Sequence, residues 1–175
     1  DSAQFVGPTV RHGAVLGQKA GFRRARGGAS VEIEDCSFDE PEGASGGVSF
    51  ADTRFAGPAS FNWSRFASDV SFESSRFEDD ASFLGLEAPG RANWRNVAFA
   101  RDAEFRACRL GEVDFGDEKQ MSVFAGLADF RGCTMRSLRL DYVDARGDVM
   151  LVNVRVDPGD LAMRNAVLRG LRSDF

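Results

Sequence analysis

Residues 48–83 read VSFADTRFAGPASFNWSRFASDVSFESSRFEDDASF, and phenylalanine recurs in this stretch at a nearly constant interval. The steps between successive phenylalanines alternate strictly between five and six positions, so the true period is eleven. A fixed short period of this kind is typical of a coiled, quasi-one-dimensional repeat architecture. The seven ring positions are Phe50, Phe55, Phe61, Phe66, Phe72, Phe77 and Phe83.

A small or β-branched residue lies two positions before each phenylalanine, as Val48 does before Phe50 and Ala59 before Phe61. Two residues that are two positions apart on an extended strand share a face. The residues between the pairs are mostly polar and suit turns. A period near 5.5 fits neither an amphipathic helix nor a continuous strand. The sequence therefore predicts an all-β fold, a parallel β-helix solenoid whose coils stack about 4.8 Å apart.

We expect four sides per coil and about 20–22 residues per coil, because two of the eleven-position repeats then complete one turn. This arrangement predicts which large side chains stack in columns inside the rod. The predicted columns are Phe50, Phe72 and Trp94; Phe61, Phe83 and Phe105; Phe55, Phe77 and Phe99; and Phe66, Ala88 and Leu110.

The same frame continues over nearly the whole chain, so we expect a single domain over residues 1–175. Residues 116–120 interrupt the frame and read as an insertion between coils. Upstream, the large inward positions are predicted to be Phe5, Val10, Leu16, Phe22, Ile33 and Phe38.

Four of the units resemble those of the pentapeptide-repeat family, which has a large Leu or Phe at the centre and a small residue two places earlier. They are Val48-Ser49-Phe50, Ala59-Ser60-Phe61, Val70-Ser71-Phe72 and Ala81-Ser82-Phe83. The resemblance implies a right-handed, four-sided β-helix. The chain departs from the family's strict period of five by adding one residue in every second unit.

The resemblance also implies one specific partner. Some pentapeptide-repeat proteins resemble duplex DNA in size and charge, bind DNA gyrase and confer quinolone resistance. A DNA mimic of this type is therefore an alternative function for the chain, and it requires no direct contact with nucleic acid.

Motifs that carry chemistry are scarce in this sequence. His12 is the only histidine, and residues 43–47 match G-x-S-x-G without the following helix and downstream histidine that a nucleophile elbow needs. The sequence holds no P-loop, dinucleotide fingerprint or metal-binding cluster. We therefore predict no enzymatic activity, no cofactor and no metal.

The three cysteines, Cys36, Cys108 and Cys133, all fall at the small inward position. An odd number without C-x-x-C argues against a zinc site or a disulfide framework, so we predict buried, reduced thiols. No apolar run is long enough for a membrane span and no secretory signal is visible, so a cytoplasmic location is expected. The chain begins at Asp1 rather than at methionine, as expected of a trimmed chain or of a domain cut from a longer protein. Its excess of arginine over lysine suggests a GC-rich bacterial genome.

Charge is unevenly distributed along the chain. Residues 1–31 carry a net charge of +4, whereas residues 32–83 carry twelve acidic residues against three arginines, a net charge of −9. We predict that the outward acidic residues, with an exposed tryptophan as an anchor, form a candidate interaction face. Its members are Asp39, Glu40, Glu42, Asp52, Trp63, Asp69, Glu73, Glu78, Asp79 and Asp80.

Two interpretations of this acidic belt stay open. Carboxylates stacked along a rod resemble the phosphate track of a duplex. Alternatively, the belt is the polar coat that keeps a solenoid soluble. The arginines Arg54 and Arg76, one coil apart, are expected to pair with nearby carboxylates such as Glu78.

The leading hypothesis is a non-catalytic scaffold that binds a protein partner, because solenoids present extended binding faces. The first alternative is the gyrase-binding DNA mimic. The second is end-to-end assembly or a homodimer, since an uncapped solenoid exposes edge strands that can pair with another copy. Leu168, Leu171 and Phe175 are the apolar residues expected at such an end.

Overall fold

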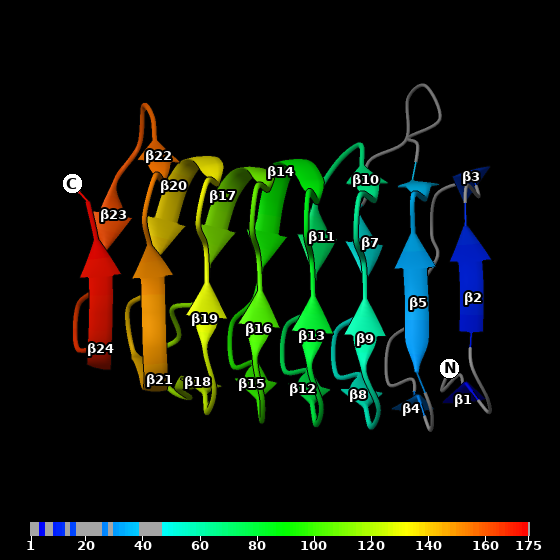
Figure 1. Ribbon diagram of the computed structural model, residues 1–175, viewed down its shortest axis with the longest axis horizontal. Helices are drawn as coiled ribbons and strands as arrows, with labels where there is room; N and C mark the ends of the chain where they lie inside the picture. The colour runs from blue at the N-terminus through cyan, green and yellow to red at the C-terminus, as the bar shows by residue number, and fades with distance from the viewer. Residues whose placement is uncertain are drawn as a thin grey trace.

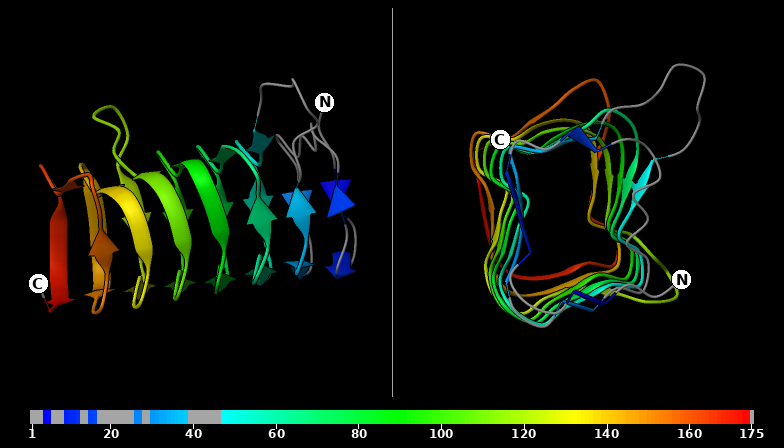
Figure 2. Two further views of the ribbon diagram at one scale, coloured as in Figure 1. Left: turned by 90° about the horizontal axis from the view of Figure 1, so that it is seen from above. Right: turned by 90° about the vertical axis from the view of Figure 1, so that its right-hand side faces the viewer.

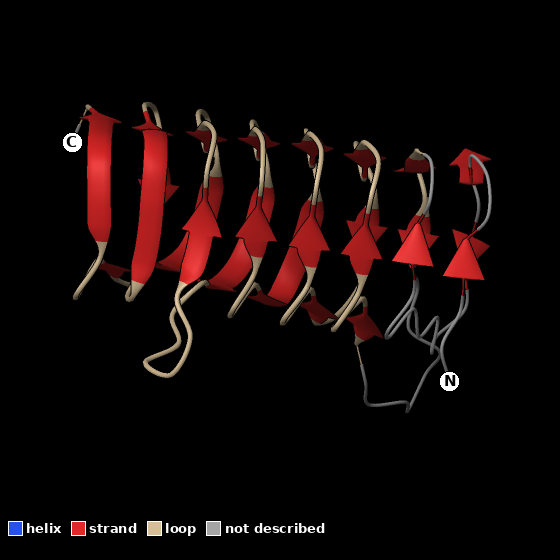
Figure 3. Ribbon diagram, turned by 90° about the horizontal axis from the view of Figure 1, so that it is seen from below, coloured by secondary structure: helices blue, strands red, loops and turns tan. Residues whose placement is uncertain are grey.

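A computed structural model of the chain describes residues 4–5, 9–12, 15–16, 26–27, 30–38 and 47–174, with side chains from residue 30 onward. The described residues form 24 short strands and no helix (Figures 1 and 3). Their strand pairings are parallel, and the strands stack as a β-solenoid of about six turns. The prediction of an all-β solenoid is confirmed.

The strands stack in four ladders, which we number in the order in which the chain passes them. The first ladder comprises β1 (Gln4–Phe5), β4 (Arg26–Gly27), β8 (Arg54–Phe55), β12 (Arg76–Phe77), β15 (Ala98–Phe99) and β18 (Ser122–Phe124). The second ladder comprises β2 (Thr9–His12), β5 (Val31–Glu34), β9 (Ala59–Ser60), β13 (Ala81–Ser82), β16 (Ala103–Glu104) and β19 (Ala128–Asp129).

The third ladder comprises β3 (Val15–Leu16), β6 (Ser37–Phe38), β10 (Arg65–Phe66) and β22 (Arg155–Val156), and the fourth comprises β7 (Val48–Ser49), β11 (Val70–Ser71) and β23 (Leu161–Ala162). Three longer strands span the corner between these two ladders: β14 (Glu87–Asn93), β17 (Arg109–Asp114) and β20 (Thr134–Arg139). In the same way β21 (Val143–Leu151) joins the first and second ladders, and β24 (Val167–Ser173) pairs with it. Seen along the rod, the coils have a roughly rectangular outline, which is compatible with four sides (Figure 2).

The strand register confirms the predicted coil length in the middle of the rod. Arg54 pairs with Arg76, and Ala81 pairs with Ala103, each pair being separated by twice the eleven-position period. The coil that holds residues 116–120 is longer by three, because Ala103 pairs with Ala128. This insertion, drawn in yellow-green in Figure 2, leaves the rod as a loop, as the interrupted sequence frame predicts.

The rings stack in the predicted columns. The centroids of Phe72 and Trp94 lie 4.1 Å apart, and those of Phe61 and Phe83 lie 5.3 Å apart, with nearly parallel planes. Phe55, Phe77 and Phe99 form the third column, at 4.5 and 4.8 Å. In the fourth column, Phe66, Ala88 and Leu110 are all buried. The strand register places them one above another, because Arg65 pairs with Glu87 and Ala88 pairs with Leu110. The structure extends three columns by one ring each, with Phe115, Phe130 and Phe124.

Two kinds of corner explain why the ring spacing alternates between five and six. After the second and fourth ladders the chain turns through a left-handed residue, such as Asp52 (φ 57°) or Trp63 (φ 58°), and needs only five positions from ring to ring. These tight corners close with a backbone hydrogen bond, as from Ser64 N to Phe61 O (3.3 Å). The corners after the first and third ladders take six positions. We call these the loose corners; they include residues 56–58, 67–69, 78–80 and 100–102.

The small inward residue after a tight corner often bonds to the coil before it. Ser75 Oγ donates to Phe50 O (2.7 Å) and accepts from Thr53 N (3.1 Å). The thiols of Cys108 and Cys133 occupy equivalent positions and donate to backbone carbonyl groups of the preceding coil. Burial raises the pKa of the Cys108 thiol well above its ordinary value. The prediction of three buried, free cysteines is confirmed.

Replacing Ser75 by alanine is expected to lower the free energy of unfolding by about 1–3 kcal/mol, since two cross-coil hydrogen bonds are lost in a buried position. Urea denaturation measures the change. Ser68→Ala, a half-buried serine at a loose corner, is the control and is expected to change it by less than about 0.5 kcal/mol. Equal effects of the two substitutions would contradict a bridging role for Ser75.

The sequence frame is wrong by one residue in β2, whereas Phe5 and Leu16 of the same coil keep the predicted register. Thr9 and Arg11 pair with the buried Val31 and Ile33, whereas Val10 pairs with the half-buried Glu32. The regular alternation downstream therefore does not extend to this strand. Phe22 lies outside the described residues.

Candidate interaction surface

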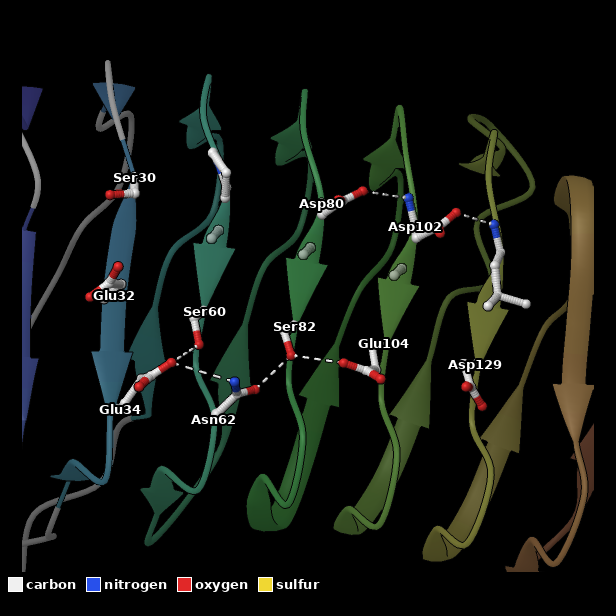
Figure 4. A pocket seen from close by; sticks show the side chains of 15 residues that line it. Ser30, Glu32, Glu34, Ser60, Asn62, Asp80, Ser82, Asp102, Glu104 and Asp129 are labelled. Atoms are coloured by element: carbon white, nitrogen blue, oxygen red, sulfur yellow. Dashed lines mark hydrogen bonds between the residues drawn. The ribbon is translucent and has the colours of Figure 1, made fainter.

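A groove crosses the outer face of the second ladder, from β5 to β19 (Figure 4). Its volume is about 450 Å³. The outward residues along its floor are paired coil to coil, and they are Glu32, Ser60, Ser82, Glu104 and Asp129. The two serines have short side chains, which leave the hollow between the bulkier residues at either end. We call this feature the acidic groove.

Hydrogen bonds connect one side of the acidic groove across four coils (Figure 4). Ser60 and Asn62 donate to the same oxygen of Glu34, the latter over 3.4 Å. Ser82 Oγ lies 2.7 Å from Asn62 Oδ1 and 3.2 Å from Glu104 Oε2, so its single proton has two acceptors. The chain of neutral donors holds the carboxylates in fixed positions and leaves their negative charge in place.

On the other side of the groove, two aspartates at loose corners accept backbone N–H groups of the following coil. Asp80 Oδ1 accepts from Asp102 N (3.3 Å), and Asp102 Oδ1 accepts from Leu127 N (2.8 Å). Asp69 does the same at the opposite corner, with Arg91 N (2.7 Å). An aspartate at these positions therefore joins successive coils through a neutral donor.

The far end of the groove is neutralised by arginines. Arg131 binds Asp129 at 2.6 Å, and Arg106 pairs with Glu104. Burial of the Asp129 carboxyl opposes ionisation, but the hydrogen bonds and charge of Arg131 outweigh it, so the pKa lies below its ordinary value. The uncompensated charge is therefore concentrated between β5 and β16.

Asp129→Asn is expected to lower stability near pH 7 and to have little effect near pH 2. Because the folded pKa is depressed, ionised Asp129 stabilises the fold above the unfolded pKa of about 3.9, and this contribution is lost as pH falls through the folded pKa. Urea midpoints across this range test it. Asp148→Asn, at an exposed pair with Arg172, is the control with a small expected effect, and an equal loss at every pH would contradict the assignment.

The residues of the predicted interaction face do not lie on one side of the rod but at several different corners. Glu78 and Asp79 lie at the loose corner that leads to the second ladder, Asp69 lies at the loose corner before the fourth, and Asp52 and Glu73 follow the fourth-ladder column. Among the described members, only Asp80 lines the acidic groove. Asp39, Glu40 and Glu42 lie outside the described residues.

Several of these acidic residues hold partners within the chain. Glu78 accepts two bonds of 2.7 Å from Arg54, as the sequence predicts, and the hydrogen bond from Arg54 lowers the pKa of Glu78 despite some desolvation. Asp79 pairs with Arg101 at 3.3 Å, and Glu73 accepts from an asparagine of the next coil. These contacts join one coil to the next. The outward acidic residues that predicted an interaction face therefore also stabilise the stacking of the coils.

Trp63 follows Asn62 of the groove at a tight corner, and its side chain is 58% exposed. One face of its ring lies against Gly85, where an added Cβ would come within 2.2 Å of Trp63 Cε3. Gly85 itself has a left-handed φ of 66°, so both conformation and space favour glycine there. Trp63 thus lies flat over a corner and also offers its other face to solvent.

The face of the fourth ladder, opposite the acidic groove, carries an alternating ladder of charges that the sequence analysis missed. Arg95 binds Asp114 at 2.6 Å, and Arg139 lies 3.6 Å from Asp114 and 3.7 Å from Asp141. A hollow of about 680 Å³ follows this ladder. Arginines and carboxylates are balanced here, so this face is close to neutral, whereas the acidic groove is negative. In the sequence, this ladder of charges could have been recognised from arginine and aspartate residues at outward positions about one coil apart.

No cluster of three or more His, Cys, Asp or Glu residues in the part of the chain that the structure describes is arranged to hold a metal ion. No helix among the described residues could span a membrane. Residues 43–46 of the G-x-S-x-G match and the side chain of His12 lie outside what the structure describes.

Comparison with known proteins identifies one relationship. The family model of pentapeptide repeats (9 copies) matches residues 45–85. No curated protein and no solved structure matches the chain. The matched segment covers the stretch in which the alternating ring spacing is strictest, and the same ladders continue on both sides of it. Residues 45–85 therefore carry pentapeptide repeats, and the solenoid built from them extends over the described residues on both sides.

Proposed function

We propose that this chain is a non-catalytic interaction module that binds a protein partner along the acidic groove. The observation that carries the proposal is a preformed hollow across five strands whose lining includes six carboxylates and no lysine, arginine or histidine. Repeat solenoids use extended faces of this kind for binding. The exposed ring of Trp63 beside the groove adds a suitable anchor.

The environment of the groove carboxylates supports binding over catalysis. Glu104 and Asp129 are paired with arginines, and Asp80 and Asp102 accept backbone N–H groups. Acid–base catalysis needs a carboxyl whose pKa is moved toward neutrality, whereas the pKa of Asp129 is lowered. Such a surface recognises charge and shape.

Affinity capture with three forms of the protein tests this function. The groove variant combines Glu32→Gln, Asp80→Asn and Asp102→Asn, in which each asparagine oxygen can still accept the backbone N–H. The control variant combines Glu112→Gln, Asp117→Asn and Glu118→Gln, with the same change in charge outside the groove. We expect a partner that binds the wild type and the control, and binds the groove variant at least about tenfold more weakly when remeasured with purified components. A turnover activity that disappears in the groove variant would contradict the proposal.

A second candidate function is DNA mimicry directed at DNA gyrase. The observation that favours it is the stacking of Asp80 and Asp102 one coil apart on the same wall, which repeats negative charge along the rod. The serines on the floor and the arginines at the far end interrupt this track. A supercoiling assay tests it: inhibition or protection of gyrase at micromolar protein supports mimicry, and no effect with or without a quinolone rejects it.

A third candidate is end-to-end assembly through the C-terminal coil. β24 pairs only with β21 among the described strands, and Val167 and Leu171 are 48% and 41% exposed. An open edge beside apolar side chains favours pairing with another copy. Light scattering over a range of concentrations tests it, and a monomer whose mass does not change with concentration rejects it.

A further inference from the structure

We propose that the acidic groove takes an extended, cationic peptide segment of a partner protein, with basic side chains at positions i and i+4. This inference rests on the proposed interaction function and specifies its ligand. Three features of the groove support it: the charge that it retains, its length and direction, and the spacing of its carboxylates.

The charge of the groove is retained where the walls and floor lack cations. Asp80 and Asp102 each accept a hydrogen bond from a neutral backbone N–H, a contact that brings no positive charge to either carboxylate. Glu32 lies half-buried on the floor one coil before Ser60. Arg101, which directly precedes Asp102, pairs with Asp79, which does not line the groove. A ligand that fits this surface must bring positive charge.

The groove runs across the strands, parallel to the rod axis (Figure 4). Four coil-to-coil steps separate Glu32 from Asp129, which at about 4.8 Å per step gives about 19 Å. An extended chain of about six residues covers this length at about 3.3 Å per residue. The hollow of about 450 Å³ lies over the short serine side chains and runs across the five strands, as suits a single extended chain.

The spacing of the floor carboxylates selects the pattern of basic residues. Glu32 and Glu104 are three coils apart, about 14 Å, and residues i and i+4 of an extended chain are about 13 Å apart on the same face. Ser60 and Ser82 lie between them and leave room for the side chain at i+2. Glu104 is already paired with Arg106, but Asp102 lies in the same coil, so two lysines or arginines at i and i+4 meet Glu32 at one end and Asp102 at the other. Asp80, one coil before Asp102 on the same wall, lies beside the same path.

Fluorescence anisotropy with two labelled peptides tests the inference on purified protein. The peptide SKTTTKS places its lysines at i and i+4 on one face, whereas STKKTTS has the same composition with adjacent lysines on opposite faces. We expect the wild type to bind the first peptide at least about fivefold more tightly. The groove variant should lose at least about tenfold in affinity for it, and the control variant less than about twofold.

Equal affinity for the two peptides, an equal loss in the two variants, or no binding at millimolar protein would each overturn the inference. Displacement of the first peptide by spermine at equal concentration would also overturn it, because any linear polycation would then suffice. A partner that is captured through the groove while neither peptide binds would leave the interaction function in place and reject only the extended-peptide ligand. Thermal unfolding of both variants confirms that they are folded before binding is measured.

Discussion

Replacing Phe83 by alanine is expected to lower the free energy of unfolding by about 3–5 kcal/mol, the usual range for removing a fully buried ring. Phe83 stacks between Phe61 and Phe105, at 5.3 and 4.8 Å, and meets Phe72, Phe77, Trp94 and Phe99 edge-on or nearly so. Its loss leaves a cavity that touches three of the four columns, where the fixed ladders allow little collapse.

The location of Phe83 predicts a second effect, because each coil contacts only its neighbours. The weakened junction lies between the coils on either side of β13, so the N-terminal coils should open at a lower free energy than the C-terminal ones. In the alanine variant, hydrogen exchange should be accelerated more strongly in the backbone amides of β8 and β9 than in those of β19 and β21. Phe83→Leu, which keeps most of the volume, is the control with an expected loss of less than about 1.5 kcal/mol. Uniform exchange along the rod in the alanine variant would contradict this local coupling.

The interior of the rod could be predicted from sequence because its rule is local and repeated. A ring and a small residue two positions before it specify which side chains face inward, and the constant length of a coil then specifies which rings stack, as Phe72 does on Trp94. The same reasoning fails at Val10, where no strict repeat surrounds the strand and a shift of one residue reverses the faces.

The acidic groove could not be predicted in the same way, because it depends on which outward residues become neighbours across coils. Nothing in the sequence marks Ser60 and Ser82, and they form a hollow only because Glu32 and Glu104 stand on either side. One signal was available: an aspartate directly before the small inward residue, at Asp69, Asp80 and Asp102. At the longer steps these aspartates accept a backbone N–H of the next coil, whereas Asp52 before Thr53 lies at a tight corner, so the signal has to be read together with the step length.

Deleting residues 81–102 is expected to give a shorter rod that still folds, whereas deleting residues 81–96 is expected to prevent cooperative folding. The first deletion removes one complete coil, so Ala103 takes the place of Ala81 above Ala59. The ladders, the columns and both kinds of corner then remain in register. Far-UV circular dichroism and the width and midpoint of the thermal transition measure the outcome.

The second deletion is shorter, yet it removes three sides and moves every later strand onto the next ladder. Val97 would follow Asp80, so the loose corner after Phe99 would lie above the tight corner of Trp63. Backbone bonds such as Trp63 N to Leu84 O (2.8 Å) would lose their partner, and the cross-coil bonds at the tight corners would meet the wrong turn. If both deletions folded equally well, ring spacing alone would determine the stacking of this solenoid, and the two kinds of corner would have no part in setting its register.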